Sequence, residues 1–136
     1  MINVDPSYKM IKFYRYMVFL NYKFLVPYGG IFMSRSVLEP KRIRKISSTF
    51  AFIEHRFIRD GFFESLNLHE LILYFFLILV GDRFGVSWYA YDKICAILRI
   101  TLDEYIDARN SLIDKDLIVF DGYTFQVLSL PEKCFC

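Results

Sequence analysis

The chain has 136 residues, which is enough for one compact domain with an appended arm but not for a second full domain. Its residues are 55% hydrophobic and 19% aromatic, a composition that excludes a wholly disordered protein. The net charge of +2 hides an asymmetry, because residues 1–59 carry eleven Lys or Arg against three acids, whereas residues 60–136 carry six against twelve. Such a split indicates either a basic segment for an anionic partner or two parts that attract each other.

The first 33 residues form a basic, aromatic extension without clear helical periodicity. Nine of them are aromatic, and Asp5 is the single acid among them. One interpretation is a surface for membrane headgroups or nucleic acid. The others are a helix that packs on the domain, or an extension upstream of a native start at Met33. We favour the last two, because an amphipathic membrane helix needs a clear apolar face.

We predict neither a signal peptide nor a membrane span. The basic start is followed by five uninterrupted apolar residues, 16–20, whereas a signal core needs roughly 7–15. The apolar run 71–80 has ten residues, and a span needs about 20. We therefore expect a cytoplasmic protein, and attachment to a membrane surface ranks behind the other hypotheses.

Residues 34–49 are predicted to be a solvated basic linker or arm. Pro40 interrupts any helix, and four positive charges fall within the next five positions: Lys41, Arg42, Arg44 and Lys45. We expect the folded domain to occupy residues 50–131, with residues 132–136 as a tail.

The domain is predicted to begin with a short helix over Phe50–Arg59. Phe50, Ile53 and Phe57 would share one face of this helix, and Asp60-Gly61 would end it. A short buried strand over 50–53 is the alternative, because a brief apolar run does not distinguish the two.

Stronger signals begin at Asn67, which can form a capping box with Glu70 ahead of a helix over 68–80. This helix is apolar nearly all round, which predicts burial on several sides. A turn over 81–85, a short strand over 86–88 and a second helix over 91–98 follow. The apolar set of the second helix is Ile94, Cys95, Ile97 and Leu98.

Thr101 and Glu104 form a second potential capping box, which begins a third helix over 102–114. The predicted buried stripe of this helix contains Leu102, Tyr105, Ile106, Leu112 and Ile113, with Arg109 at its edge. Its predicted exposed stripe contains Asp103, Asp107, Asn110 and Asp114. A strand over 117–120, a two-residue type I′ turn at Asp121-Gly122 and a return strand over 123–128 complete the domain.

This order of elements predicts an α+β fold, mainly helical with a small β-hairpin. Helix, short strand, two helices joined by about three residues, and hairpin together are typical of a winged helix-turn-helix. The second and third helices would be the helix-turn-helix pair, and the hairpin would be the wing.

Three segments of this domain are also distinctive as sequences. They are Gly81-Asp82-Arg83-Phe84-Gly85-Val86-Ser87, Tyr91-Asp92-Lys93-Ile94-Cys95 and Leu128-Ser129-Leu130-Pro131. Through them residues 52–131 resemble a family of small bacterial winged helix-turn-helix proteins of unassigned role. The resemblance implies a DNA-binding fold and a bacterial source. It supplies no catalytic motif, and residues 1–33 lie outside it.

The leading functional hypothesis is DNA binding by a regulatory or accessory protein of transcription. Its expected contacts are Lys41, Arg42, Arg44 and Lys45 of the arm, and Arg99, Thr101 and Arg109 near the third helix. For Arg109, however, an ion pair with Asp103 or Asp107 is a more common role than a base contact.

The alternative hypothesis is a protein-interaction module, because a fold does not determine a function. Asp103, Asp107 and Asp114 would oppose a phosphate backbone, and they could instead form an acidic docking face for a protein partner.

The sequence predicts no enzyme, no cofactor and no metal site. His55 and His69 have no second ligand or nucleophile at motif spacing. Cys134 and Cys136 alone do not complete a set of metal ligands. No glycine-rich phosphate loop or serine-centred elbow occurs.

Overall fold

The structure is a computed structural model that describes residues 36–134. The chain divides at Thr49 and Phe50 into two units, and each is considered by itself. In the first unit, residues 36–49 are all exposed and contain one short 3-10 helix, η1 (Pro40–Arg42). Glu39 caps η1, because its carboxylate accepts a hydrogen bond from the Lys41 N–H at 3.2 Å.

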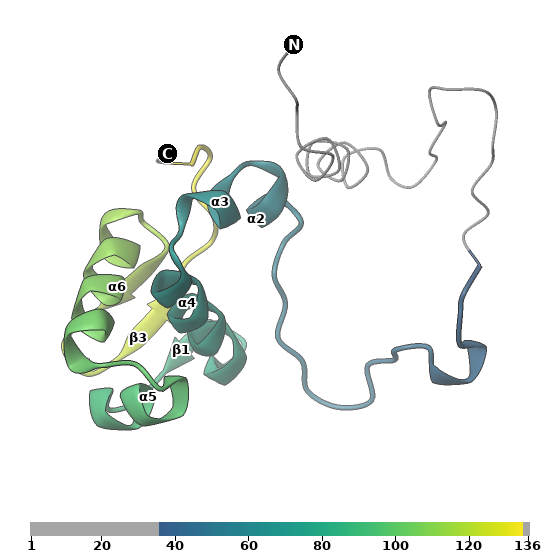
Figure 1. The fold of residues 1–136 in the computed structure, drawn as a ribbon, viewed down its shortest axis with the longest axis horizontal. Coiled ribbons are helices and arrows are strands. Elements are labelled where there is room, and N and C mark those ends of the chain that lie inside the picture. Colours follow the sequence, from purple (N-terminus) through teal and green to yellow (C-terminus); the bar gives the residue numbers. More distant parts are fainter. Residues whose placement is uncertain (1–35, 135–136) are drawn as a thin grey trace, which may run out of the picture. The chain divides into compact units, whose positions relative to one another are not determined.

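The second unit combines five α-helices with a small antiparallel sheet (Figure 1). The elements are α2 (Arg56–Arg59), α3 (Phe62–Ser65), α4 (Leu68–Val80), β1 (Val86–Ser87), α5 (Tyr91–Leu98), α6 (Leu102–Asp114), β2 (Ile118–Phe120) and β3 (Phe125–Val127). The sheet order is β1-β3-β2. The predicted α+β class is therefore confirmed for the described residues.

Both predicted capping boxes are present. Asn67 accepts from the Glu70 N–H at 2.9 Å, and Glu70 accepts from the Asn67 N–H at 3.0 Å. At the start of α6, Thr101 accepts from the Glu104 N–H at 3.2 Å, and Glu104 accepts from the Thr101 N–H at 2.8 Å. These bonds satisfy N–H groups that have no partner within a helix, so α4 and α6 begin where the sequence predicts.

The short helix predicted over Phe50–Arg59 is wrong in its first half. Residues 50–53 are neither helix nor strand, and Phe50 is 67% exposed. The chain instead forms two four-residue helices that bend at Gly61, whose φ of 88° favours glycine. This bend brings Phe57 and Phe62 together, with their ring centres 6.3 Å apart. Instead of one continuous helix, the chain forms two short helices whose aromatic side chains pack with Tyr74 and Phe75 of α4.

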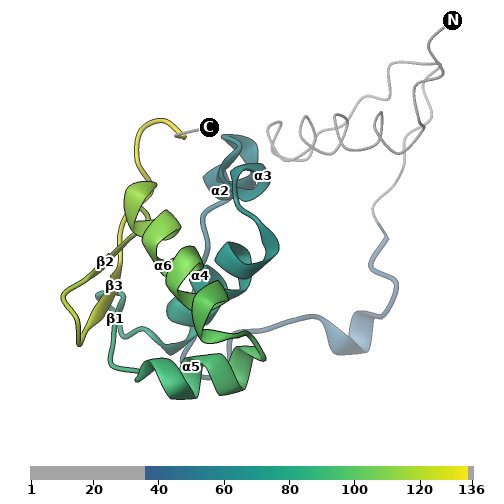
Figure 2. The same ribbon diagram turned by 60° about the vertical axis from the view of Figure 1, so that its left-hand side comes forward.

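The core of the second unit lies between α4, α6 and the sheet. Figure 2 shows α6 crossing α4, with the β2–β3 hairpin along one side of α6. Leu73, Leu77 and Leu112 are fully buried there. Burial of α4 on several sides is confirmed only in part, because Leu68 and Leu79 are exposed.

The predicted apolar faces of α5 and α6 are partly correct. On α5 only Ile94 is fully buried, and Ile97 is 54% exposed. On α6 the prediction omitted Ala108, which is buried, and included Leu102, which is exposed. A small residue such as Ala108 gives little periodic signal.

The hairpin turn differs from the predicted type I′ turn at Asp121-Gly122. Phe120 pairs with Phe125, so residues 121–124 connect the strands. A type I′ turn needs a positive φ at both central residues, and Asp121 does not have one. Its carboxylate instead accepts from the N–H groups of Tyr123 and Thr124 at 2.8 and 2.7 Å, which closes the loop through a side chain.

None of the helices within residues 36–134 has both the length and the apolar character required to cross a membrane.

Candidate nucleic-acid interface

The basic arm consists of Lys41, Arg42, Arg44 and Lys45, and all four side chains are exposed. No acid within residues 36–134 forms an ion pair with any of them. Their charges are therefore available to an anionic partner at little desolvation cost.

Arg99 and Thr101 lie in the short connection between α5 and α6. Arg99 is exposed and ends α5 in the left-handed conformation, with a φ of 56°. The Thr101 hydroxyl oxygen is already engaged as the cap of α6. Of these two predicted contacts, Arg99 has the freer side chain.

Arg109 does not form the ion pair with Asp103 or Asp107 that the sequence predicts. Its guanidinium group lies over the ring of Tyr105, 5.5 Å from the centre, and over the ring of Phe120, 5.2 Å from the centre. It also donates to the Asn110 side chain at 3.1 and 3.3 Å. Arg109 therefore lies against the hairpin, and within the described residues it forms no ion pair with the carboxylates of α6.

The predicted exposed stripe of α6 is confirmed. Asp103, Asp107, Asn110 and Asp114 are all exposed, and we call them the outer face of α6. Among the described residues no cation pairs with these carboxylates. The outer face would therefore repel a phosphate backbone.

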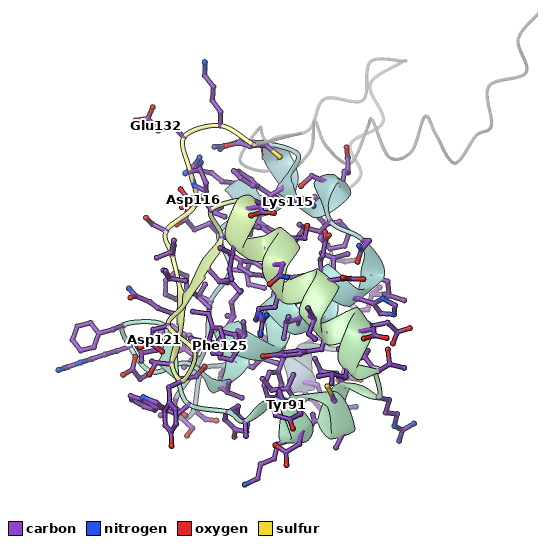
Figure 3. All side chains as sticks on the ribbon, turned by 90° about the vertical axis from the view of Figure 1, so that its left-hand side faces the viewer. Tyr91, Lys115, Asp116, Asp121, Phe125 and Glu132 are labelled. Atoms are coloured by element: carbon purple, nitrogen blue, oxygen red, sulfur yellow. The ribbon has the colours of Figure 1, made fainter. Side chains whose placement is uncertain are left out.

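Lys115, which directly follows α6, is a second cation, and its side chain is directed toward the start of α4. Its Nζ lies 2.8 Å from Glu70 Oε2 and 2.9 Å from the carbonyl oxygen of Ser65. Figure 3 shows Lys115 at one end of α6. Glu70 is only 5% exposed, so this is a buried ion pair. It links the end of α6 to the start of α4.

The electrostatics of Glu70 follow from this pair. Burial alone would raise its pKa, but hydrogen bonds from Lys115, Ser111 and the Asn67 N–H outweigh burial and hold the pKa below its ordinary value. Glu70 is thus a buried carboxylate that remains charged. Its position beside a cap was visible in the sequence, whereas its partner 45 residues away was not.

A groove of about 910 Å³ lies between α6, the start of α5 and the hairpin. Its exposed aromatic residues are Trp88, Tyr91 and Tyr123, which are 63%, 57% and 82% exposed. Lys93 and Arg109 are its cations, and no carboxylate is among the residues that line it. We call this feature the aromatic groove. The sequence does not predict this groove, because its residues come from three separate stretches of the chain, 88–93, 102–109 and 120–123.

The described residues contain no cluster of three or more His, Cys, Asp or Glu side chains that could hold a metal ion. The Cys95 thiol is unpaired and partly exposed. Burial, and then the nearby charge of Asp92, raise its pKa, which disfavours the reactive thiolate.

Comparison with known proteins found no matching family model, no matching curated protein and no matching solved structure. The winged helix-turn-helix assignment and the resemblance to small bacterial proteins therefore stay predictions.

Proposed function

We propose that the chain is a DNA-binding regulatory or accessory protein built on a winged helix-turn-helix. The chain order α4-β1-α5-α6-β2-β3 and the sheet order β1-β3-β2 support this scaffold. In it, α5 and α6 are the helix-turn-helix pair, and the β2–β3 hairpin is the wing.

One observation carries the proposal of DNA binding: the basic arm exposes four cations within five positions. Phosphate contacts of this kind supply most of the sequence-independent affinity of DNA-binding proteins. Arg99, beside the start of α6, adds an exposed cation to the folded unit.

The outer face of α6 limits how the folded unit meets DNA. A recognition helix reads base edges from the major groove, where its exposed side chains lie among phosphates. The exposed carboxylates of Asp103, Asp107 and Asp114 oppose that placement. In our proposal the arm therefore provides the attraction, and the outer face remains away from the duplex.

The test is a titration of random-sequence duplex DNA at several salt concentrations. Replacing Lys41, Arg42, Arg44 and Lys45 by Ala should weaken binding about equally on all sequences. It should also make the plot of log binding constant against log salt concentration less steep, by up to roughly 3.6 units of slope, at about 0.9 per phosphate contact. The double variant Arg83→Ala/Lys133→Ala removes two exposed cations outside the arm, and it should leave the slope nearly unchanged. An unchanged slope in the arm variant would refute the role of the arm.

A protein-interaction module is the second candidate, and the outer face of α6 is the observation that favours it. Three exposed carboxylates without an ion-pair partner in the described residues suit a basic partner segment. In this case a lysine-rich peptide should bind, replacing the three Asp residues by Asn should abolish that binding, and duplex DNA should not bind even at low salt.

A further inference from the structure

We propose that the aromatic groove binds single-stranded nucleic acid by stacking of unpaired bases. This proposal rests on the proposed function, because both assign a nucleic acid as the ligand. It concerns a different surface, because none of the residues that line the groove belongs to the basic arm.

The groove presents three aromatic rings to solvent from two stretches of the chain that are about 30 residues apart. Trp88 follows β1, Tyr91 begins α5, and Tyr123 lies in the loop of the hairpin. Figure 3 shows Tyr91 toward the end of α6 opposite to Lys115, and Asp121, in the same loop as Tyr123, on the hairpin. Large aromatic side chains that converge on one hollow while more than half exposed mark a binding surface.

The cations of the groove are suited to phosphate and to bases. The Arg109 guanidinium is held on the rings of Tyr105 and Phe120, so it is ordered before any ligand arrives. Lys93 also lines the groove and is exposed. Because no carboxylate lines the groove, its charge complements a phosphate backbone, in contrast to the outer face of the same helix.

These features favour a single strand over other occupants. In a duplex the bases are stacked on one another, whereas a single strand offers open faces to aromatic side chains. The aromatic extension of this chain, residues 1–33, is an unsuitable occupant because it is basic, like the groove. An acidic or neutral aromatic peptide remains as the competing ligand, and the experiment includes it.

Trp88 provides the measurement, because it is the single tryptophan of the whole chain. We would titrate the full chain with a short oligothymidylate at low salt and follow tryptophan fluorescence. The expected result is saturable quenching. Removing one stacking ring by Tyr123→Ala should weaken the affinity at least about fivefold, whereas Tyr123→Phe should preserve it.

Phe84→Ala is the matched control. Phe84 is 64% exposed and lies under the Arg83 guanidinium at 4.7 Å, but it does not line the groove. The control should bind oligothymidylate like the parent. Thermal unfolding of each variant separates a lost contact from a lost fold.

Two results would overturn the proposal. One is the absence of quenching by oligothymidylate, whether or not an aromatic peptide quenches Trp88. The other is quenching that Tyr123→Ala leaves unchanged.

The same titration in the Ala variant of the basic arm separates this proposal from the proposed function. If oligothymidylate still quenches Trp88 in the arm variant and the parent protein does not bind duplex DNA, only the duplex hypothesis is refuted. Duplex binding by the parent protein without quenching would refute the groove alone.

Discussion

Two sides of α6 carry opposite chemistry. The outer face contains Asp103, Asp107 and Asp114, all exposed. The side toward the hairpin contains Tyr105 and Arg109, whose guanidinium group rests on aromatic rings. One helix thus has an acidic side that repels phosphate and an aromatic, cationic side that can attract it.

This difference arises from tertiary contacts as well as from helical spacing. Arg109 is spaced to meet a carboxylate on its own helix, yet it lies over Phe120 of β2. Lys115 follows α6 directly, yet it reaches Glu70 of α4. Within the described residues neither cation therefore pairs with a carboxylate of the outer face, which leaves that face acidic.

The largest expected effect on stability comes from removing the buried ion pair between Lys115 and Glu70. Lys115→Met should lower the free energy of unfolding by about 3 kcal/mol, because it leaves the Glu70 carboxylate buried without its partner. Urea denaturation measures this change. Lys133→Met, at an exposed position, should have little effect. A loss below about 1 kcal/mol for Lys115→Met would instead place Lys115 among weak surface pairs.

The pH dependence of stability tests the same pair from the side of Glu70. The pKa of Glu70 is lowered in the folded state, so at acidic pH the folded state binds fewer protons than the unfolded state. The stabilisation is complete above the ordinary carboxyl pKa and is lost as the pH falls through the lowered value. Glu70→Gln should therefore show a shallower acid destabilisation than the parent.

Urea denaturation from neutral to acidic pH gives this comparison. Some acid sensitivity should remain in Glu70→Gln, because the pKa values of Asp60, Glu104 and Asp121 are also lowered. Glu132→Gln, at an exposed site, is the control. Parallel pH curves for Glu70→Gln and the parent would show that the pair does not shift the titration.

Replacing the cap of α6 should have an intermediate effect. Thr101→Ala should cost about 1 kcal/mol of stability, because the Glu104 N–H loses its acceptor, and Thr101→Ser should restore most of it. At temperatures where both variants are folded, their affinity for duplex DNA should differ little. A large loss of affinity at unchanged stability would make Thr101 a DNA contact.

The smallest stability effect is expected on the outer face. Replacing Asp103, Asp107 and Asp114 by Asn should change the free energy of unfolding by no more than about 0.5 kcal/mol per site, since all three are exposed and unpaired within the described residues. Thermal unfolding measures this. A larger loss would indicate that these carboxylates support the fold.

The features that the sequence predicts well depend on nearby residues. Each capping box places its partners three positions apart, so the starts of α4 and α6 could be read directly. The acidic stripe follows from helical spacing in the same way. The basic arm could be identified from the local density of Lys and Arg residues.

The features that the sequence did not predict depend on residues far apart in the chain. The Lys115–Glu70 pair spans 45 positions, and the aromatic groove combines residues from 88 to 123. Phe50 and Ile53 were expected to share one helix face with Phe57, but Phe50 and Ile53 are exposed and only Phe57 is buried. At Asp121 the composition of the turn was identified, but the side chain closed the loop in a way that the dipeptide rule does not include.

The most direct test of DNA binding away from the outer face is one titration of random duplex DNA at low and moderate salt. It compares the full-length parent with the variant in which Asp103, Asp107 and Asp114 are Asn. We expect the parent to bind at low salt and to weaken steeply as salt rises, and we expect the variant to bind at least as tightly. No binding by the parent at low salt, or weaker binding by the variant, would contradict this account.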